Sequence, residues 1–252
     1  MITTLALTML AFVTFVYIVS LIIKDASIMD VAWGLGFILV AAQSLYLSFQ
    51  LNLPVTWMKL VLLGLICFWG LRLTFHIWTR HHGEDKRYTE WRVAWGSTFA
   101  LRSYVQIFLL QGSLILLISM PVWLAMQSTF KTNMWVFLTG CFVWLAGFLF
   151  EMIADAQLAT HLRTSRGKIM QTGLWRYSRH PNYFGEALLW WGVFLIGLSF
   201  SVTAYSLFAP VTITFLLLFV SGVPLLEKRF AGNPEWEHYK RHTSVFVPWF
   251  RK

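Results

Sequence analysis

Four polar side chains near the fifth and sixth apolar segments of this sequence have the types and spacing of a ligand site. Glu151 and Asp155 are four residues apart, and so are Asn182 and Glu186, so each pair lies on one face of a helix. Asparagine offers a donor and an acceptor, which complements a carboxamide or an adenine edge, whereas glutamate requires a donor such as a hydroxyl or a cation. The alternative for Glu151 and Asp155 is a structural pair that joins two helices.

Basic residues surround the start of the sixth segment. Pro181 suits a first helical turn, and Gly173 and Gly185 permit close approach of the backbone. Backbone N–H groups at a helix N-terminus and guanidinium groups both donate to anionic oxygens, so this segment predicts a phosphate site. An interfacial belt is the alternative, but it would not need the Asn and Glu one turn deeper. We therefore expect a cytoplasmic cofactor-binding loop over 160–182, with the cations Lys168, Arg176, Arg179 and His180.

The end of the chain, 226–252, alternates acidic, basic and aromatic residues after the last apolar segment. This pattern is typical of a cytoplasmic amphipathic helix that lies on lipid headgroups. The alternative is a lid over a cofactor bound by the preceding loop. The residues that such a lid would use are Glu227, Arg229 and Tyr239.

Long apolar segments must position these side chains. Of the 252 residues, 58% are hydrophobic and 12% are charged, and average soluble proteins carry about twice that charged fraction. A span needs about 20 mostly apolar residues, and the qualifying segments are 2–23, 27–49, 54–79, 103–126, 133–157, 183–203 and 205–225. The sequence therefore predicts an all-α polytopic membrane protein with about seven transmembrane helices, forming one integral membrane domain over 1–252.

The distribution of Lys and Arg predicts the orientation of these helices. The net charge is +9, but the basic residues lie in short tracts between apolar runs, which argues against a nucleic-acid partner. With the N-terminus outside and the C-terminus in the cytoplasm, only Lys59 and Lys131 fall outside and Arg72 lies within a span. The first segment has no basic residues before its apolar run, so we expect a retained helix and not a signal peptide.

Cysteine and histidine spacing predicts neither a disulfide nor a metal site. Cys67 and Cys141 both lie within apolar segments, where a thiol behaves as a small hydrophobic group. His81 and His82 have no metal-type spacing to another His or Cys, so no metal is assigned.

The run Gly-Leu-Trp-Arg-Tyr-Ser-Arg-His-Pro-Asn-Tyr-Phe-Gly-Glu at 173–186, together with Glu151, Asp155 and the tail, resembles the bacterial DUF1295 proteins. These are membrane relatives of steroid 5α-reductase, in a superfamily with sterol Δ14-reductases and isoprenylcysteine carboxyl methyltransferases. The segments 30–34 and 69–88 look like the N-terminal part of the same family.

The resemblance implies a helix bundle in the bacterial inner membrane that binds NADPH in a cytoplasmically open cavity. It also implies reduction of an activated C=C bond of a lipid, such as a 3-oxo-Δ4 steroid. The residues that it implies for cofactor binding are Asp155, Arg163, Lys168, Tyr177, Arg179, His180, Asn182, Tyr183, Glu186, Glu227, Arg229 and Tyr239.

Hydride transfer to an enone also needs a group that polarises the carbonyl as enolate charge develops. The candidates for this catalytic role are Asp30, His76, Arg80 and Tyr88. His76 would act protonated or through a neutral N–H, and Asp30 would orient it. The alternative for Asp30 and Arg80 is a salt bridge or a helix cap.

Two rival functions stay open at this point. One is an S-adenosylmethionine-dependent methyltransferase acting on a lipid or an isoprenylcysteine, and the other is a non-catalytic lipid-binding protein. NADPH carries a pyrophosphate and a 2′-phosphate, which need several cations, whereas S-adenosylmethionine carries no phosphate. The loop cations that favour the dinucleotide are Arg163, Arg166, Lys168, Arg176 and Arg179. The expected partners are a lipid-like substrate and membrane lipids, with the oligomeric state left open.

Overall fold

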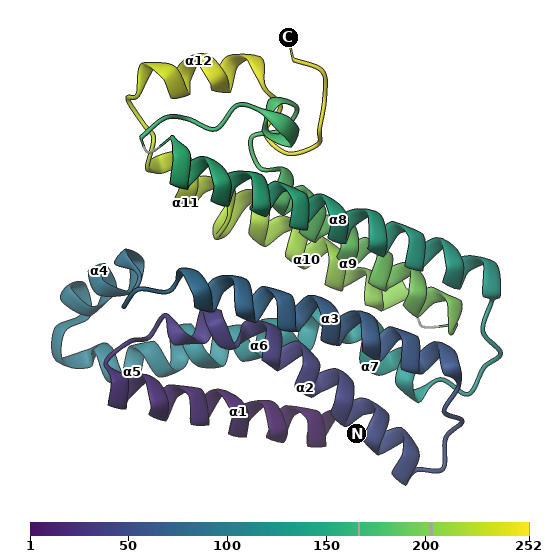
Figure 1. The fold of residues 1–252 in the computed structure, drawn as a ribbon. Coiled ribbons are helices and arrows are strands. Elements are labelled where there is room, and N and C mark those ends of the chain that lie inside the picture. Colours follow the sequence, from purple (N-terminus) through teal and green to yellow (C-terminus); the bar gives the residue numbers. More distant parts are fainter. Residues whose placement is uncertain (166, 202–203, 252) are drawn as a thin grey trace. The chain divides into compact units, whose positions relative to one another are not determined.

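The computed structural model describes residues 1–165, 167–201 and 204–251, and these divide into two compact units where the sequence predicts one domain (Figure 1). Unit 1 is Met1–Lys131 and unit 2 is Thr132–Lys252. The described residues form helices and one isolated bridge between Ser178 and Ser244, with no strand. The all-α prediction is therefore confirmed.

Unit 1 is built around a central helix, α2. Its elements are α1 (Ile2–Ile23), α2 (Ile28–Gln50), α3 (Trp57–Arg80), α4 (Lys86–Trp95), a short 3-10 turn (Gly96–Thr98), α5 (Phe99–Ser103), the π-helix η2 (Tyr104–Leu109), α6 (Leu110–Ile118) and α7 (Met120–Gln127). Helix α2 packs against α1, α3, α6 and α7. The contact with α3 is close because a Cβ on Gly34 would lie 2.2 Å from the carbonyl oxygen of Gly70.

Lys59 has an unexpected place in unit 1. The sequence places it at the outer end of the third apolar segment, and it lies in the first turn of α3 with only 1% exposure. Its Nζ donates to the carbonyls of Pro54, Met126 and Ser128 at 2.7, 2.8 and 2.9 Å. Because the last carbonyls of α7 have no partner within their helix, this ammonium group caps α7 and ties it to α3.

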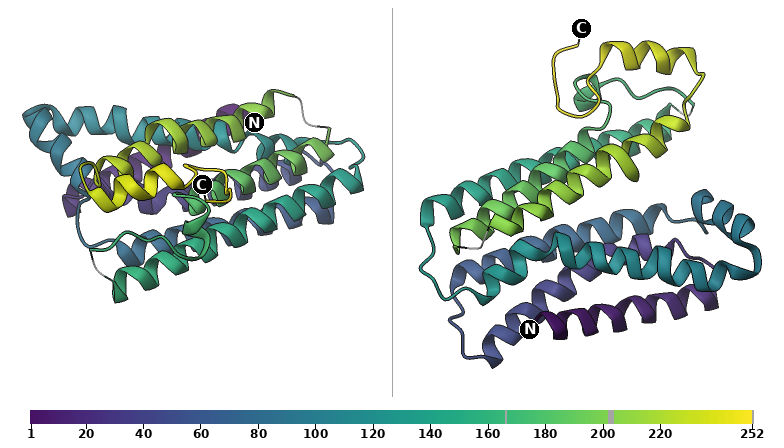
Figure 2. Two further views of the ribbon diagram at one scale, coloured as in Figure 1. Left: turned by 90° about the horizontal axis from the view of Figure 1, so that it is seen from above. Right: turned by 180° about the vertical axis from the view of Figure 1, so that it is seen from behind.

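Unit 2 is built around a long antiparallel pair, α8 and α9 (Figure 2). Its elements are α8 (Met134–Thr164), η3 (Gly173–Arg176), α9 (Pro181–Ser199), η4 (Ala204–Leu207), α10 (Phe208–Phe215), the π-helix η5 (Leu216–Val220), α11 (Val223–Lys228) and α12 (Pro234–His242). Asn133 caps α8 by accepting from the N–H groups of Trp135 and Val136. Pro181 occupies the first turn of α9, as the sequence predicts.

Glycines let α8 and α9 approach closely. A Cβ on Gly147 would lie 2.4 Å from Leu189 N, and one on Gly185 would lie 2.4 Å from Glu151 N. Both distances are far below ordinary van der Waals contact and involve backbone atoms, which cannot move aside cheaply. These glycine contacts therefore place the backbone around Glu151 directly against the first turns of α9.

The described residues contain six helices long and apolar enough to cross a membrane, which indicates an integral membrane protein. They are Ile2–Ile23, Ile28–Gln50, Trp57–Arg80, Lys86–Ile118, Met134–Thr164 and Tyr205–Lys228. The helix expected over 183–203 forms as α9 but is not among them, since its first turns carry Asn182 and Glu186. Which side of the membrane each terminus occupies stays a prediction.

Candidate functional site

The start of α9 carries a partly buried hydrogen bond between two of the predicted cofactor residues. Asn182 Nδ2 donates to Asp155 Oδ1 on α8 at 3.1 Å. Because a carboxylate can only accept a hydrogen bond, the Asn182 amide must point its NH₂ group at Asp155. The amide oxygen, Asn182 Oδ1, therefore points away from Asp155. Among the described residues, that buried Oδ1 has no hydrogen-bond partner. A ligand that donates an N–H is what this oxygen lacks.

The loop before α9 is held against α8 by two side chains. The Trp175 indole donates to the carbonyl of Ala154 at 3.0 Å, and the Leu174 N–H donates to Gln157 Oε1 at 2.9 Å. Gly173 allows this approach with a φ of 62°, a left-handed conformation that side chains disfavour. The predicted loop over 160–182 is shorter than expected, because α8 continues to Thr164.

The tail closes over the same loop. Tyr239 on α12 is 1% exposed, and its hydroxyl donates to the carbonyl of Trp175 and, at 3.3 Å, to that of Ser178. Burial raises the pKa of the Tyr239 phenol, so it stays protonated and able to donate. Ser178 Oγ in turn donates to the carbonyl of Phe246 at 2.7 Å, and Arg179 N–H donates to that of Ser244 at 2.8 Å. Tyr239, predicted to contact the cofactor, thus braces the loop.

Glu227 contacts the two most deeply buried of the predicted basic residues, Arg179 and His180. It lies 2.8 Å from Arg179 Nη1 and 3.2 Å from His180 Nε2, and Lys240 Nζ is 3.6 Å away. The side chains of Arg179 and His180 are only 8% and 3% exposed. Both side chains therefore contact Glu227 and are not displayed for a phosphate. The other His180 ring nitrogen, Nδ1, has no partner in the described part of the chain.

The remaining predicted cofactor residues line the same end of unit 2. Tyr183 stacks on the His180 ring at 5.5 Å, and Glu186 lies half-buried one turn beyond Asn182. The carbonyl of Tyr177 accepts from the backbone of the tail at 2.9 Å. The exposed cations here include Arg163, Lys168, Arg176, Lys228 and Arg229. Arg166 lies outside the described residues, as does Lys252 at the end of the tail.

These residues fit NADPH. The nicotinamide carboxamide and the adenine amino group both offer an N–H for Asn182 Oδ1. The pyrophosphate and the 2′-phosphate match Arg163, at the exposed end of α8, and Lys168 and Arg176, exposed in the segment that follows. The unit therefore offers both the amide acceptor and the anion-binding groups that this dinucleotide needs.

Unit 1 brings together two of the predicted catalytic residues. Tyr88 on α4 is 3% exposed, and its hydroxyl donates to Asp30 Oδ1 at 2.6 Å. Arg87 Nη2 donates to Asp30 Oδ2 at 3.0 Å, and the Gln111 amide donates to the Tyr88 hydroxyl at 3.4 Å. This cluster joins an acid, a phenol and a guanidinium group in one network.

His76 and Arg80 contact each other one turn apart on α3, with Arg80 Nη1 3.1 Å from His76 Nε2. The partners that the structure gives Asp30 are Arg87 and Tyr88. A role of Asp30 in orienting His76 stays a prediction, and so does its alternative pairing with Arg80.

A second polar cluster fixes the turn between α1 and α2, and the sequence reasoning missed it. Asp25 accepts from the Ser27 hydroxyl at 2.6 Å and lies 2.7 Å from His81 Nε2. Arg92 pairs with Glu84 through two bonds of 2.6 and 3.0 Å. The run of charges after α3 was the sequence signal for these contacts, but Asp25 lies 56 residues before His81.

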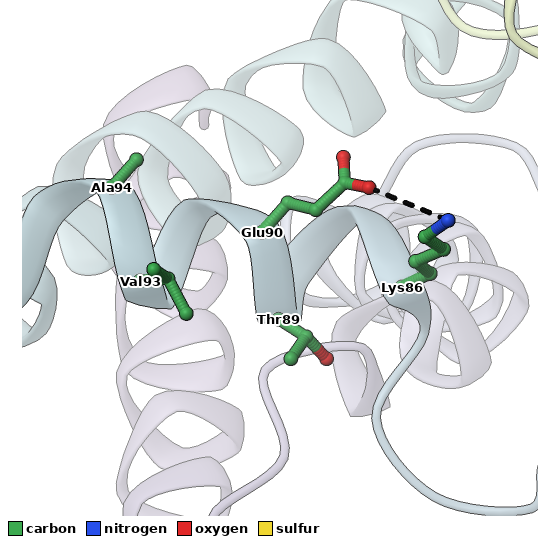
Figure 3. Close-up of a pocket in the computed structure, with 5 residues that line it drawn as sticks. All are labelled: Lys86, Thr89, Glu90, Val93 and Ala94. Carbon is green, nitrogen blue, oxygen red and sulfur yellow. Dashed lines mark ion pairs between the residues drawn. The ribbon is translucent and has the colours of Figure 1, made fainter.

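Helix α4 also borders a hollow of about 360 Å³, lined by Lys86, Thr89, Glu90, Val93 and Ala94 (Figure 3). Lys86 and Glu90 form an exposed ion pair of 3.8 Å on this face. All five residues belong to one helix, so the hollow has a single wall. It contains none of the predicted catalytic residues and offers no enclosed reaction site.

Comparison with known proteins identifies the family. The family model described as a protein of unknown function, DUF1295, matches residues 16–243, so the chain belongs to this family. An uncharacterised protein of Schizosaccharomyces pombe is 26% identical over 265 residues, covering 91% of this chain and 74% of that protein. The 3-oxo-5-alpha-steroid 4-dehydrogenase 1 of Bos taurus is 32% identical over 119 residues, 44% of this chain and 41% of that protein. No solved structure matches.

Proposed function

We propose that this DUF1295 protein is an NADPH-dependent membrane reductase that acts on an activated C=C bond of a steroid-like or other lipid enone. The bovine relative is a 3-oxo-5-alpha-steroid 4-dehydrogenase by name. That similarity supports a reductase-like enzyme, and the chemistry of unit 2 supports the dinucleotide. The proposed location is the bacterial inner membrane, with the N-terminus outside.

The observation that carries this proposal is the buried pair Asp155 and Asn182. Asp155 fixes the amide of Asn182, so that its Oδ1 acts as an oriented acceptor without a partner in the described part of the chain. A buried acceptor left unpaired costs about 1–3 kcal/mol. A ligand amide that donates to Asn182 would recover that cost.

Other residues of unit 2 have supporting roles in the proposal. Bound NADPH would supply the hydride. Arg163, Lys168 and Arg176 hold its phosphates, while Tyr239 and Glu227 order the loop that carries these groups. S-adenosylmethionine has no phosphates for the loop cations to bind, so the methyltransferase is the weaker alternative.

Tyr88 is the proposed group that polarises the substrate carbonyl. Its hydroxyl donates its one proton to Asp30, which Arg87 also binds, so the substrate carbonyl would have to replace Asp30 as the acceptor of that proton. Asp30, His76 and Arg80 remain proposed contributors to the same step. A phenol directed at the carbonyl would stabilise the negative charge that develops on its oxygen.

The test is the melting temperature of the detergent-purified protein with NADPH, NADH, S-adenosylmethionine or S-adenosylhomocysteine. A ligand that binds only the native state stabilises it by about 2.7 kcal/mol at a hundredfold excess over Kd. We expect a shift with NADPH that Asn182→Ala removes. The matched control is Asn52→Gly, which deletes an amide in a turn whose φ of 54° glycine tolerates. A shift with the S-adenosyl compounds alone would overturn the reductase.

A further inference from the structure

The segment 86–118 is longer than a membrane span requires. It has 33 residues, whereas about 20 suffice to cross the hydrocarbon core. Helix α4 ends at Trp95, and Gly96 follows with a φ of 51°, which turns the backbone away from the helix. The first part of the segment, α4, is therefore available to lie at the membrane surface while α5 to α6 enter the bilayer.

A groove of about 530 Å³ lies between α4 and the helix that follows it. It is lined by Trp91 and Trp95 from α4 and by Val105, Gln106 and Leu110 from η2 and α6. The two indoles stack at 5.6 Å with an interplanar angle of 10°. Tryptophan is enriched at the membrane–water boundary, because its ring is apolar and its N–H is polar. The lining is therefore suited to the upper part of a lipid.

One cation near the groove is not used by the protein. The acids of this region are paired in Glu84–Arg92, Asp85–Arg87 and Glu90–Lys86. Arg102 is exposed and has no ion pair within the residues described. It precedes Gln106 by four residues, so both side chains lie on the same helical face. A positive charge thus stands at one end of an apolar groove.

Gln106 is a polar group where lipid tails are expected. It is exposed, belongs to the π-helix η2, and makes no hydrogen bond within the described ranges. An amide without a partner in hydrocarbon costs several kcal/mol. π-helices are rare and occur frequently at functional sites. The ester carbonyl of a glycerolipid would accept from this amide one turn below the charge of Arg102.

We propose that this groove binds one diacyl phospholipid with a net negative headgroup. Arg102 binds the phosphate, Gln106 donates to an ester carbonyl, and the acyl chain lies along Val105, Leu110 and the stacked indoles. The inference rests on unit 1 alone and does not depend on the proposed reductase activity.

The experiment is native mass spectrometry of the purified full chain titrated with phosphatidylglycerol or phosphatidylcholine. We expect one retained phosphatidylglycerol, bound several-fold more tightly than phosphatidylcholine. Arg102→Gln should weaken phosphatidylglycerol about tenfold and remove the preference, because it deletes a charge-assisted hydrogen bond. Leu110→Trp should weaken both lipids, because it fills the groove.

The matched control is Lys86→Gln, which removes a cation from the opposite face of α4 and should leave binding unchanged. Arg102 is exposed, so Arg102→Gln is expected to keep the wild-type melting temperature. If Arg102→Gln melts at a lower temperature, Gln106→Leu replaces it in the test. Equal binding by wild type and Arg102→Gln, or an equal loss in Lys86→Gln, would overturn the proposal. The proposal would also be overturned if inorganic phosphate displaced phosphatidylglycerol and Leu110→Trp left phosphatidylglycerol binding unchanged. The site would then bind a free anion.

Discussion

A methyl group added at Gly185 should separate α8 from α9 and disable the proposed cofactor site. In the native packing a Cβ there would lie 2.4 Å from Glu151 N and 2.7 Å from the Gly147 carbonyl oxygen. Ordinary contact begins at 3.4 Å, so the helices must move apart by about 1 Å. Asn182 and Asp155 lie within one turn of this contact, and their 3.1 Å hydrogen bond has little length to spare.

The magnitude follows from the cost of overpacking. Forcing a methyl group into a filled interface costs about 1–3 kcal/mol, and a chain of this size loses roughly 2–4 °C of melting temperature per kcal/mol. We therefore expect Gly185→Ala to melt about 2–12 °C below wild type. We also expect it to lose the NADPH-induced shift.

The assay is a thermal melt with and without NADPH, and the matched control is Gly64→Ala. Gly64 also lies within a helix, α3, but a Cβ there has nothing within 4 Å. Alanine is favoured over glycine in helices by about 0.8–1.0 kcal/mol, so this variant should equal or exceed wild-type stability and keep its NADPH shift. Equal melting temperatures and equal NADPH shifts in the two variants would refute the packing argument.

Three further substitutions probe separate parts of the molecule. Tyr239→Phe should lower stability by about 1–3 kcal/mol, because it removes the buried hydroxyl from two loop carbonyls; a melt with and without NADPH should show a smaller ligand shift, and an unchanged melt would contradict the bracing role. Tyr88→Phe should lower turnover of an enone lipid and leave the NADPH shift intact, so loss of nucleotide binding would count against a carbonyl donor. Lys59→Met should lower the melting temperature, at roughly 2–4 °C for each kcal/mol lost, since it removes three charge-assisted hydrogen bonds of about 1.5–3 kcal/mol each, whereas Lys131→Met, exposed in a loop, should not.

The residues of the proposed cofactor site could be chosen from the sequence, because Asp155, Asn182 and the cations between them are close along the chain. Helical spacing put Glu151 and Asp155 on one face of α8, where both are buried, and Pro181 marked the start of α9. The order of residues in 173–186 also led to the correct family. These features depend on local backbone geometry, which the chain encodes over one or two turns.

The partners of the charged residues could not be predicted from the sequence. Arg179 and His180 looked like phosphate ligands, yet Glu227, nearly 50 residues away, engages both of them. Asp30 pairs with Arg87 in α4, whereas Arg80, at the end of α3, contacts His76.

Lys59 and the glycine contacts show the physical reason for this limit. A buried ammonium group binds whichever carbonyls the packing places around it, and for Lys59 two of these belong to residues more than 60 positions away. The distance between α8 and α9 likewise depends on glycines facing each other from both helices. Local patterns determine which elements form, but only the tertiary packing decides which polar groups remain available to a ligand.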